Sequence, residues 1–354
     1  MMNGDRKVRL LIVDDSAFMR VALERMIKEE QRIEVIGSAS NGREAIEKAV
    51  RLRPDVITMD IEMPILDGLH ALKEIMRILP IPIIMVSSLT QNGAQATLDA
   101  LDLGAVDYIS KPGSPLGVSI FNLKDELLCK IMASVGNMPS IPKPRMATLV
   151  PKKALQPAEN NTQIDRIVLL GASTGGPPAI RSILAGLSGN IPVPIVVAQH
   201  MPKTFTNAFA QRLNSLCNLR VKEAAQGEII QRSVVYVCPG DSQTRIKKID
   251  PAHFAFSITT GENEKHRYSP SIDVMFSSFT ENFGRKVVGV LLTGMGDDGV
   301  KGLAEIKQAG GMTIAQDKNS CVVYGMPRAA VERGVVDRIL PLNDISKEIE
   351  ISIK

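Results

Sequence analysis

Aromatic residues are scarce in this chain of 354 residues, which contains no tryptophan and has an aromatic content of only 4%. Proteins that bind single-stranded nucleic acid stack the bases on aromatic faces, so the composition argues against that class. The net charge is +4, and the basic residues are dispersed along the chain. Because nucleic-acid binding needs a concentrated basic surface, we expect no nucleic-acid partner.

Cysteine is also rare, and the four residues Cys129, Cys217, Cys238 and Cys321 form no C-x-x-C pair. This spacing favours neither a metal centre nor a disulfide framework. Long apolar runs are missing as well. The run near the N-terminus is too short for a signal peptide, and no run approaches a membrane span. We therefore expect a cytoplasmic protein without direct membrane insertion.

The chain is long enough for two domains, and its hydrophobic content of 44% lies in the globular range. A stretch with five prolines, residues 137–161, separates two segments in which strand and helix patterns alternate. We predict a first domain over residues 5–125, a linker over 126–162 and a second domain over 163–350. Both domains are predicted to be α/β, with doubly wound parallel sheets that place functional groups at the carboxyl ends of their strands.

Short apolar runs mark the predicted strands, and stretches with one apolar face mark the helices between them. In the first domain we predict strands at residues 8–13, 55–59, 81–86 and 105–109, and helices at 17–28 and 43–52. In the second we predict strands at 167–171, 194–199, 234–237 and 287–293, with a short antiparallel segment at 253–259.

Polar residues follow the predicted strands of the first domain. Asp14 and Asp15 end the strand at 8–13, Asp60 ends the strand at 55–59 and Ser87 ends the strand at 81–86. Lys111 follows the strand at 105–109. An aspartate after a strand is more often a turn or a cap, so each residue alone is a weak signal. Together they can form a site, because the oxygens of three carboxylates can bind Mg²⁺. Asp60 can then attack a phosphoryl group, whose oxygens can pair with Lys111 and Ser87.

The runs LLIVDDSAFMR, DVITMDIEMPILDG, IPIIMVSS and GAVDYISKP resemble the receiver domain of two-component response regulators, over about residues 8–125. The resemblance implies that Asp60 is the phosphoacceptor and that, with the two aspartates of the first strand, it binds the Mg²⁺ needed for phosphorylation. It also implies that Ser87 and Lys111 sense the phosphoryl group, and Tyr108 falls where receivers carry a switch aromatic residue. A receiver indicates only that the protein is switched.

The second domain opens with a G-x-S-x-G motif formed by Gly171, Ser173 and Gly175 at the end of a predicted strand. A serine on a tight strand-to-helix turn exposes its hydroxyl, and amides at the helix N-terminus can hold an oxyanion. Turns rich in glycine and serine also bind phosphate or simply turn the chain. The motif alone therefore leaves a hydrolase and a binding loop equally open.

Two further strands end in side chains that can complete a hydrolase site. His200 ends the next predicted strand and can serve Ser173 as a general base. A third strand leads into a glycine-rich turn with Asp297 and Asp298, of which one can orient the imidazole and the other cap a helix. Cys238 also ends a strand but has no base with matching placement, so we interpret it as a small buried residue.

The chain order of serine, histidine and aspartate differs from the order in α/β-hydrolases. The segments GASTGGPPAI, AQHMP, VCPGD, SPSIDVMFSS and LLTGMGDDG instead resemble the catalytic domain of the chemotaxis protein-glutamate methylesterases, the CheB family, over about residues 165–340. An N-terminal receiver joined to such a domain is the full architecture of that family.

The resemblance implies that Ser173 is the nucleophile, His200 the general base and Asp298 the acid, while Thr174 and Met295 lie where they can help to hold an oxyanion. It implies a phosphorylation-activated serine hydrolase that demethylates glutamyl methyl esters of methyl-accepting chemoreceptors and deamidates receptor glutamines. The expected phosphodonor is the chemotaxis histidine kinase. No cofactor is expected for the hydrolytic step.

We further expect the unphosphorylated receiver to pack over the site around Ser173, and phosphorylation of Asp60 to loosen that contact. A flexible linker of about 25 residues spans roughly 25–30 Å, which permits either arrangement. Three alternatives stay open: an anion-binding module without turnover, a serine esterase for small metabolites, and a DNA-binding response regulator. The last is disfavoured because its output domain would be shorter and carry a basic helix-turn-helix.

Overall fold

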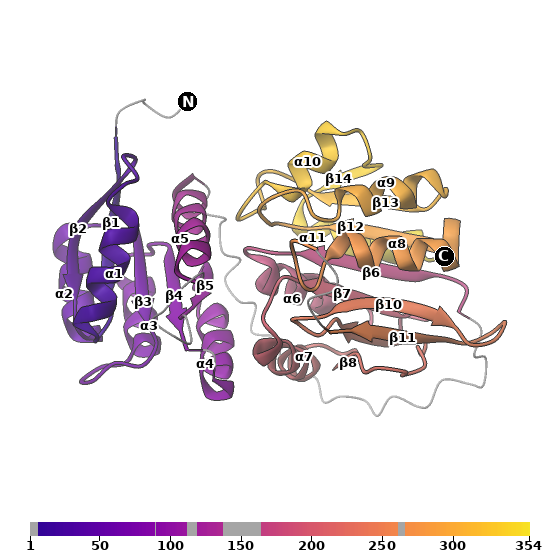
Figure 1. Cartoon of the computed structure of the whole chain (residues 1–354), viewed down its shortest axis with the longest axis horizontal. Coiled ribbons are helices and arrows are strands. Elements are labelled where there is room, and N and C mark those ends of the chain that lie inside the picture. The colour runs from indigo at the N-terminus through magenta and orange to yellow at the C-terminus, as the bar shows by residue number, and fades with distance from the viewer. Residues whose placement is uncertain (1–5, 89, 112–118, 137–163, 261–265) are drawn as a thin grey trace. The chain divides into compact units, whose positions relative to one another are not determined.

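The computed structural model in Figure 1 describes residues 6–88, 90–111, 119–136, 164–260 and 266–354. The chain divides into two compact units, Met1–Ile141 and Pro142–Lys354, and each is described by itself. Both contain a parallel sheet with helices, which confirms the predicted fold class. In these ranges, no helix has the length and apolar character needed to cross a membrane.

The first unit is built around five parallel strands in the order β2-β1-β3-β4-β5. The chain order changes direction between β1 and β3, so the carboxyl ends of these two strands meet at a topological switch point. The elements are β1 (Val8–Val13), α1 (Ala17–Ile27), β2 (Ile33–Ala39), α2 (Gly42–Leu52), β3 (Val56–Asp60), α3 (Gly68–Ile78), β4 (Ile83–Ser87), α4 (Gln91–Asp102), β5 (Asp107–Ser110) and α5 (Ser119–Gly136).

Helix α5 corrects the predicted domain boundary. The sequence interpretation began the linker at residue 126, but α5 continues from Ser119 to Gly136. Leu123, Leu127 and Ile131 recur every four residues on one helix face and are buried in the core of the first unit. Because this apolar face must cover the sheet, the first unit includes residues up to 136. The rest of the predicted linker lies outside the described residues.

The second unit contains seven parallel strands in the order β14-β13-β12-β6-β7-β9-β8, and a separate antiparallel pair, β10 and β11, where an antiparallel segment was predicted. The elements are β6 (Ile167–Ala172), α6 (Gly176–Gly186), β7 (Ile195–Gln199), α7 (Lys203–Leu216), β8 (Arg220–Glu223), β9 (Val234–Val237), β10 (Gln243–Lys248), β11 (Phe254–Thr259), α8 (Ile272–Phe283), the 3₁₀ helix η1 (Gly284–Lys286), β12 (Val287–Leu291), α9 (Val300–Gln308), β13 (Met312–Gln316), α10 (Met326–Glu332), β14 (Arg338–Leu340) and α11 (Leu342–Ser352).

The central strand β6 has β7 on one side and β12 on the other, and all three run parallel. The chain moves from β6 to β7 in one direction and from β12 to β13 in the other, so the switch point lies between β6 and β12. Glycines let helix α8 approach this point closely. A Cβ atom at Gly171 would lie 2.4 Å from Ile272 Cγ2, and one at Gly299 would lie 2.7 Å from the same atom.

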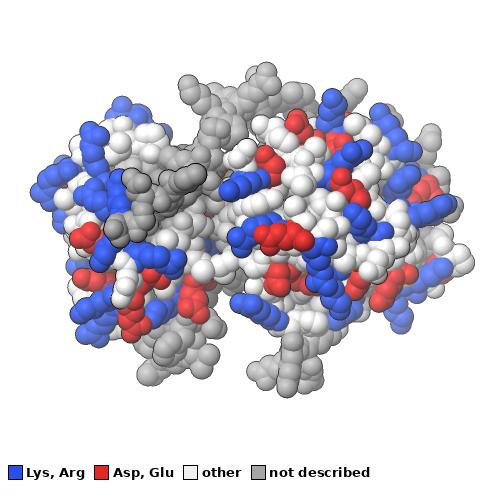
Figure 2. Space-filling view, turned by 90° about the horizontal axis from the view of Figure 1, so that it is seen from above, with Lys and Arg blue, Asp and Glu red and all other residues white. Residues whose placement is uncertain are grey.

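Charged side chains are mixed over the surface. Among the described residues on the face shown in Figure 2, lysine and arginine side chains lie interspersed with aspartate and glutamate on both units. On this face the picture agrees with the dispersed charge of the sequence.

The assignment of α5 to the first unit can be tested by truncating Leu127, whose side chain is fully buried. We expect Leu127→Ala to lower the free energy of unfolding of the first unit by about 2–5 kcal/mol, because it leaves a cavity in the core. Asp125→Ala, at an exposed position of the same helix, should change it by less than about 0.5 kcal/mol. Coinciding denaturant unfolding curves for the two variants would contradict the assignment.

Candidate functional site

Ser173 stands on a tight turn between β6 and α6. Gly175 caps the helix with a φ of 73°, a left-handed conformation that favours glycine, and a Cβ atom there would lie 2.6 Å from Val322. The amide of Gly176 donates to the carbonyl oxygen of Ser173 at 2.7 Å. The turn thus places a half-buried serine hydroxyl at the carboxyl end of the central strand.

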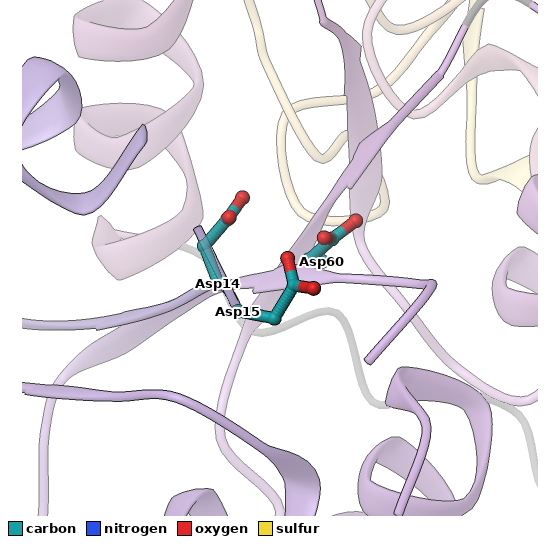
Figure 3. A group of neighbouring side chains, drawn as sticks. All are labelled: Asp14, Asp15 and Asp60. Carbon is teal, nitrogen blue, oxygen red and sulfur yellow. The ribbon is translucent and has the colours of Figure 1, made fainter. Parts of the chain in front are cut away.

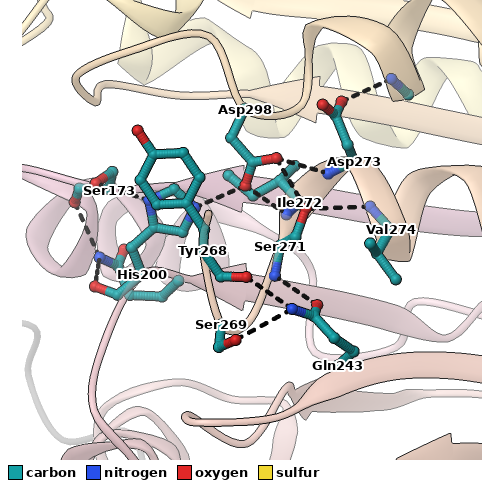
Figure 4. A network of polar contacts seen from close by, with 12 residues as sticks. Ser173, His200, Gln243, Tyr268, Ser269, Ser271, Ile272, Asp273, Val274 and Asp298 are labelled. Atoms are coloured by element: carbon teal, nitrogen blue, oxygen red, sulfur yellow. Dashed lines mark hydrogen bonds and ion pairs between the residues drawn. The ribbon is translucent and has the colours of Figure 1, made fainter. Parts of the chain in front are cut away.

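The structure brings Ser173, His200 and Asp298 together in a line (Figure 4). His200 directly follows β7, and its Nδ1 lies 3.1 Å from Ser173 Oγ. Its Nε2 lies 2.8 Å from Oδ2 of Asp298, in the turn between β12 and α9. If Nε2 carries the hydrogen and donates to Asp298, Nδ1 can accept the hydrogen of the serine hydroxyl. A general base requires this arrangement.

Asp298 is buried at the N-terminus of helix α8. Its carboxylate accepts hydrogen bonds from Ser271 Oγ at 2.9 Å and from the amides of Ile272 at 2.7 Å and Asp273 at 3.1 Å. Burial alone would raise the pKa of Asp298, but the His200 ring and these amides outweigh it and lower the pKa. The carboxylate is therefore ionised at neutral pH, at a helix end that favours negative charge. The neighbouring Asp297 is exposed.

Three residues near this line were not assigned to the site from the sequence. The Tyr268 ring stacks on the His200 ring, with centroids 4.4 Å apart and an interplanar angle of 9°. Ser271 caps helix α8, and Gln243, at the start of β10, joins the amide of Ser271 to the carbonyl group of Tyr268. A serine before an apolar helical run was a detectable signal. Nothing local indicated Tyr268 or Gln243.

Hydrogen bonds link the ends of the three strands. The amide of Ser173 donates to the carbonyl oxygen of Thr293 at 3.0 Å, and the amide of His200 donates to that of Ala172 at 3.1 Å. The Gln199 side-chain nitrogen lies 2.9 Å from the carbonyl oxygen of Ser173 and donates to it. The nucleophile turn is therefore held by both neighbouring strands, which limits its movement relative to His200.

Thr174 and Met295 both lie beside Ser173. A Cβ atom at Gly294 would lie 2.8 Å from Ser173 Cβ, so the backbone leading into Met295 passes directly by the nucleophile. Thr174 is buried, and its carbonyl oxygen accepts a hydrogen bond from Thr293 Oγ1 at 2.9 Å. Within the described ranges, neither the Thr174 amide nor the Met295 amide donates a hydrogen bond. Their predicted help in holding an oxyanion stays a prediction.

Cys238 directly follows β9 and is fully buried. Burial raises the pKa of its thiol to about 12, so the sulfur is protonated at neutral pH. Because the thiolate is the reactive form of cysteine, this residue is a poor nucleophile, in line with the sequence interpretation.

In the first unit, Asp14, Asp15 and Asp60 gather at the carboxyl ends of β1 and β3 (Figure 3). One carboxylate oxygen from each lies within 4.8 Å of the others. Asp14 and Asp60 are buried and Asp15 is exposed. Asp14 Oδ2 is buried and accepts no hydrogen bond from the described residues. A cluster of carboxylate oxygens from three aspartates fits the ligand preference of Mg²⁺.

Lys111 supplies positive charge to this cluster. Its Nζ lies 2.6 Å from Asp60 Oδ2 and forms an ion pair with Asp14 Oδ2 at 3.0 Å, without the alignment of a hydrogen bond. Burial raises the pKa of Asp60 to about 6, and the ion pair with Lys111 opposes that rise. Burial would lower the pKa of Lys111, but the two carboxylates outweigh it and raise the pKa. One lysine leaves the three carboxylates only partly neutralised.

Ser87 ends β4, and Tyr108 lies on β5. Both residues contact groups other than Asp60. The Ser87 hydroxyl lies 3.2 Å from the carbonyl oxygen of Gly93 in α4 and donates to it. Tyr108 is buried, and the Lys130 ammonium lies 5.2 Å from the centroid of its ring and donates to its carbonyl oxygen at 2.5 Å. The roles of Ser87 and Tyr108 in sensing the phosphoryl group stay predictions.

The raised pKa of Asp60 predicts how the first unit responds to pH. Between about pH 4 and pH 6 the native state holds a proton that the unfolded state has released, so stability falls as the pH rises through this window. Asp60→Asn should therefore raise the free energy of unfolding at pH 7.5, without Mg²⁺, by on the order of 1–3 kcal/mol. This gain should shrink as the pH falls to 4.

The effect of Mg²⁺ on the melting temperature tests whether Asp60 belongs to a metal site. Millimolar Mg²⁺ should raise the melting temperature of the wild-type first unit much more than that of Asp60→Asn, because we expect the ion to bind the carboxylates of the native state. Calorimetry with EDTA or Mg²⁺ measures both effects. An equal rise in both proteins would contradict a site that contains Asp60.

Known proteins resemble both units. Residues 168–349 match the CheB methylesterase family model and residues 10–117 the response regulator receiver domain model. The chain is 44% identical over 356 residues to protein-glutamate methylesterase/protein-glutamine glutaminase 1 of Geobacter sulfurreducens, covering 99% of this chain and 98% of that protein. The number 5 protein of the same name in Geobacter metallireducens is 46% identical over 351 residues, covering 98% of each chain.

A solved structure is similar to the second unit. The crystal structure of the Thermotoga maritima CheB methylesterase catalytic domain matches with 40% sequence identity and a TM-score of 0.51. The match covers 52% of this chain and 98% of that chain.

Proposed function

Because this chain belongs to the CheB family of receiver-linked methylesterases, its reaction is hydrolysis of glutamyl methyl esters, and we propose that Ser173, His200 and Asp298 carry it out. The observation that supports these roles is the pair of contacts on the imidazole: Nδ1 to Ser173 Oγ at 3.1 Å and Nε2 to Asp298 Oδ2 at 2.8 Å. A nucleophile, a base and an orienting carboxylate in hydrogen-bond reach form a serine hydrolase site.

The first half of the reaction forms an acyl-enzyme. His200 Nδ1 takes the hydroxyl proton of Ser173 as Oγ attacks the ester carbonyl carbon. The negative charge moves to the carbonyl oxygen, where the amides of Thr174 and Met295 donate hydrogen bonds to it. The intermediate then collapses, His200 gives its proton to the departing methoxide, and methanol leaves. The glutamyl group is now esterified to Ser173.

The second half frees the product. His200 Nδ1 takes a proton from water as the water oxygen attacks the acyl carbon, and the Ser173 oxygen leaves and regains that proton. The product is a glutamic acid side chain, which releases its proton to solvent and becomes a carboxylate. The same steps convert a glutamine to a glutamate and ammonia, which matches the glutaminase activity in the relatives' name. We expect that reaction to be slower because an amide is the harder bond to break.

Asp298 acts through the imidazole. It accepts the Nε2 hydrogen, which keeps the lone pair on Nδ1 toward Ser173, and it stabilises the imidazolium that forms in each half-reaction. Its pKa lies below the ordinary value, so it stays charged while His200 gains and loses a proton. The hydrolytic step needs no cofactor in this scheme.

The proposal also names partners. The substrate is a methyl-accepting chemoreceptor, the phosphodonor is the chemotaxis histidine kinase, and the reaction takes place in the cytoplasm. The names of the relatives support a protein substrate with glutamate and glutamine side chains. The receiver model supports a phosphodonor.

In the receiver, Asp60 is the proposed phosphoacceptor, and Asp14, Asp15 and Asp60 would hold Mg²⁺. Bound Mg²⁺ would supply positive charge, which would offset the negative charge of the incoming phosphoryl group. Asp60 lies 2.6 Å from Lys111 Nζ, which can pair with a phosphoryl oxygen once the aspartyl phosphate forms. Ser87 and Tyr108 are proposed to sense the phosphoryl group.

The decisive measurement is methanol release from methylated chemoreceptor membranes, with and without a small phosphodonor and Mg²⁺. We expect release by wild type to rise with phosphodonor, and Ser173→Ala to abolish it. We expect Asp298→Asn to lower kcat by on the order of 10⁴, because the imidazole loses its orienting carboxylate.

Asp297→Asn is the matched control, because it removes the same charge from the adjacent, exposed position. It should retain activity within a few-fold of wild type. Loss of activity in Asp297→Asn but not in Asp298→Asn would reassign the acid. Tight receptor binding without methanol release, unaffected by Ser173→Ala, would favour the anion-binding alternative.

Control by the receiver gives a second test. We propose that the unphosphorylated receiver restrains the hydrolase and that phosphorylation of Asp60 relieves the restraint. Residues 155–354 alone should then release methanol faster than the unphosphorylated full-length chain, and the phosphodonor should leave the rate of the fragment unchanged. Equal rates for the fragment and the unphosphorylated chain would rule out restraint by the receiver.

A further inference from the structure

The His200 ring has a partner besides Ser173 and Asp298. The Tyr268 ring lies nearly parallel to the imidazole, at 4.4 Å between centroids and 9° between planes, and covers one of its faces (Figure 4). We infer that Tyr268 is a positioning residue that holds His200 in the orientation facing both Ser173 and Asp298. The inference rests on the proposed hydrolysis and deepens it, since it explains what fixes the base.

Tyr268 is tied to Asp298 through hydrogen bonds as well. Gln243 Nε2 donates to the carbonyl oxygen of Tyr268 at 2.7 Å, and Gln243 Oε1 accepts from the amide of Ser271 at 2.9 Å. Ser271 Oγ in turn donates to Asp298 Oδ1 at 2.9 Å. Hydrogen bonds therefore link His200 in turn to Asp298, Ser271, Gln243 and Tyr268. The stack of Tyr268 on His200 completes a closed ring of contacts. Both partners that flank the imidazole thus belong to one connected set.

The phenol ring is itself held in place. The Arg267 guanidinium lies 5.4 Å from its centroid, on the scale of a cation–π contact. Gly296 has a φ of 86°, and a Cβ atom there would lie 2.9 Å from the Tyr268 hydroxyl oxygen. The glycine thus leaves room for the phenol beside the turn that carries Asp298. These contacts limit the positions that the ring can take.

Tyr268 also lines an open groove. This groove of about 420 Å³ is lined by Tyr268, Ser271 and Asp298 on the side of the site, and by residues such as Ser277 and Lys301 from α8 and α9. Tyr268 therefore both lines the groove and stacks on His200. With a smaller or non-planar side chain, the imidazole would gain room to turn toward the groove and lose its alignment.

The stacked ring also suits the charge that His200 gains during the reaction. The face of an aromatic ring attracts a cation, so the phenol favours the imidazolium that forms when Ser173 gives up its proton. A leucine is smaller than a tyrosine and offers neither a flat surface nor a π face. The ring, and not the hydroxyl, is therefore the part of Tyr268 that positions the base.

The test compares Tyr268→Leu and Tyr268→Phe in the full-length chain. We expect Tyr268→Leu to lower kcat for methanol release by on the order of tenfold to a hundredfold with little change in KM, because misalignment affects the chemical step. Tyr268→Phe keeps the ring and should restore most of the activity. Ser277→Ala, at another position in the lining of the same groove, should resemble wild type.

A substrate-independent readout separates this inference from the proposed function. A fluorophosphonate probe forms a bond from Ser173 Oγ to phosphorus with loss of fluoride, and it needs an activated serine but no receptor. We expect its labelling rate to fall in Tyr268→Leu and to stay near wild type in Tyr268→Phe, with none in Ser173→Ala. If wild type is labelled rapidly but releases no methanol, the proposed substrate is wrong while the positioning role is still tested.

Nitrogen NMR of labelled histidine reports the alignment directly. The chain has only four histidines, so the His200 signals can be assigned with one variant. In wild type and Tyr268→Phe we expect one tautomer, with hydrogen on Nε2, and in Tyr268→Leu we expect averaged nitrogen shifts. Gln243→Leu combined with Tyr268→Leu should lose little more activity than the worse single variant, because both changes break one connected set.

Either of two results would overturn the inference. The first is labelling rates and nitrogen spectra in Tyr268→Leu equal to those of wild type. The second is an equal loss in Tyr268→Phe and Tyr268→Leu, which would assign the effect to the hydroxyl group instead of the stacked ring.

Discussion

A buried negative charge at the start of helix α8 is the interaction on which the second unit's site depends. Placing a carboxylate in the protein interior is costly unless it is paired and hydrogen-bonded. Asp298 meets this requirement with Ser271, two backbone amides and His200. The helix must therefore begin directly beside the turn after β12, and Gly171 and Gly299 allow that approach because larger residues would collide with Ile272. Once α8 is in place, the orientation of the imidazole, and through it the environment of Ser173, is determined.

The receiver solves a related problem in a different way. Asp14 and Asp60 are also buried at strand ends. Asp14 accepts a hydrogen bond from the amide of Ser16, the N-cap residue of α1, at 2.9 Å, and Lys111 is shared between the two carboxylates. The charge is only partly neutralised, and burial raises the pKa of Asp60 to about 6. A site with excess negative charge is suited to bind a cation and to change when that charge changes, which is what a switch requires. The carboxylate in the hydrolase unit is fully satisfied, which suits a fixed orientation.

Much of this fold could be predicted because buried parallel strands are short continuous apolar runs. The predicted strand at 167–171 corresponds to β6, and that at 194–199 to β7, each within a residue or two. Strands β8 and β14 were not predicted, since Arg220–Glu223 and Arg338–Leu340 are edge strands with exposed residues and lack the pattern of a buried strand. The predicted linker began too early because the apolar face of α5 continues past residue 125.

The sequence by itself determined which reactive residue types stand at the ends of apolar strands, since strands and turns are encoded by local periodicity. It thereby supplied Ser173, His200, the Asp297–Asp298 pair and the receiver carboxylates. Residue patterns alone left the choice between Asp297 and Asp298 open, and only the family resemblance favoured Asp298. The tertiary structure decided which carboxylate meets the imidazole, which ring nitrogen faces Ser173, and that Tyr268 and Gln243 join the site. The physical reason is that β10 and the segment before α8 approach β7 only through packing of the whole unit, and no local pattern records contacts between segments so distant in the chain.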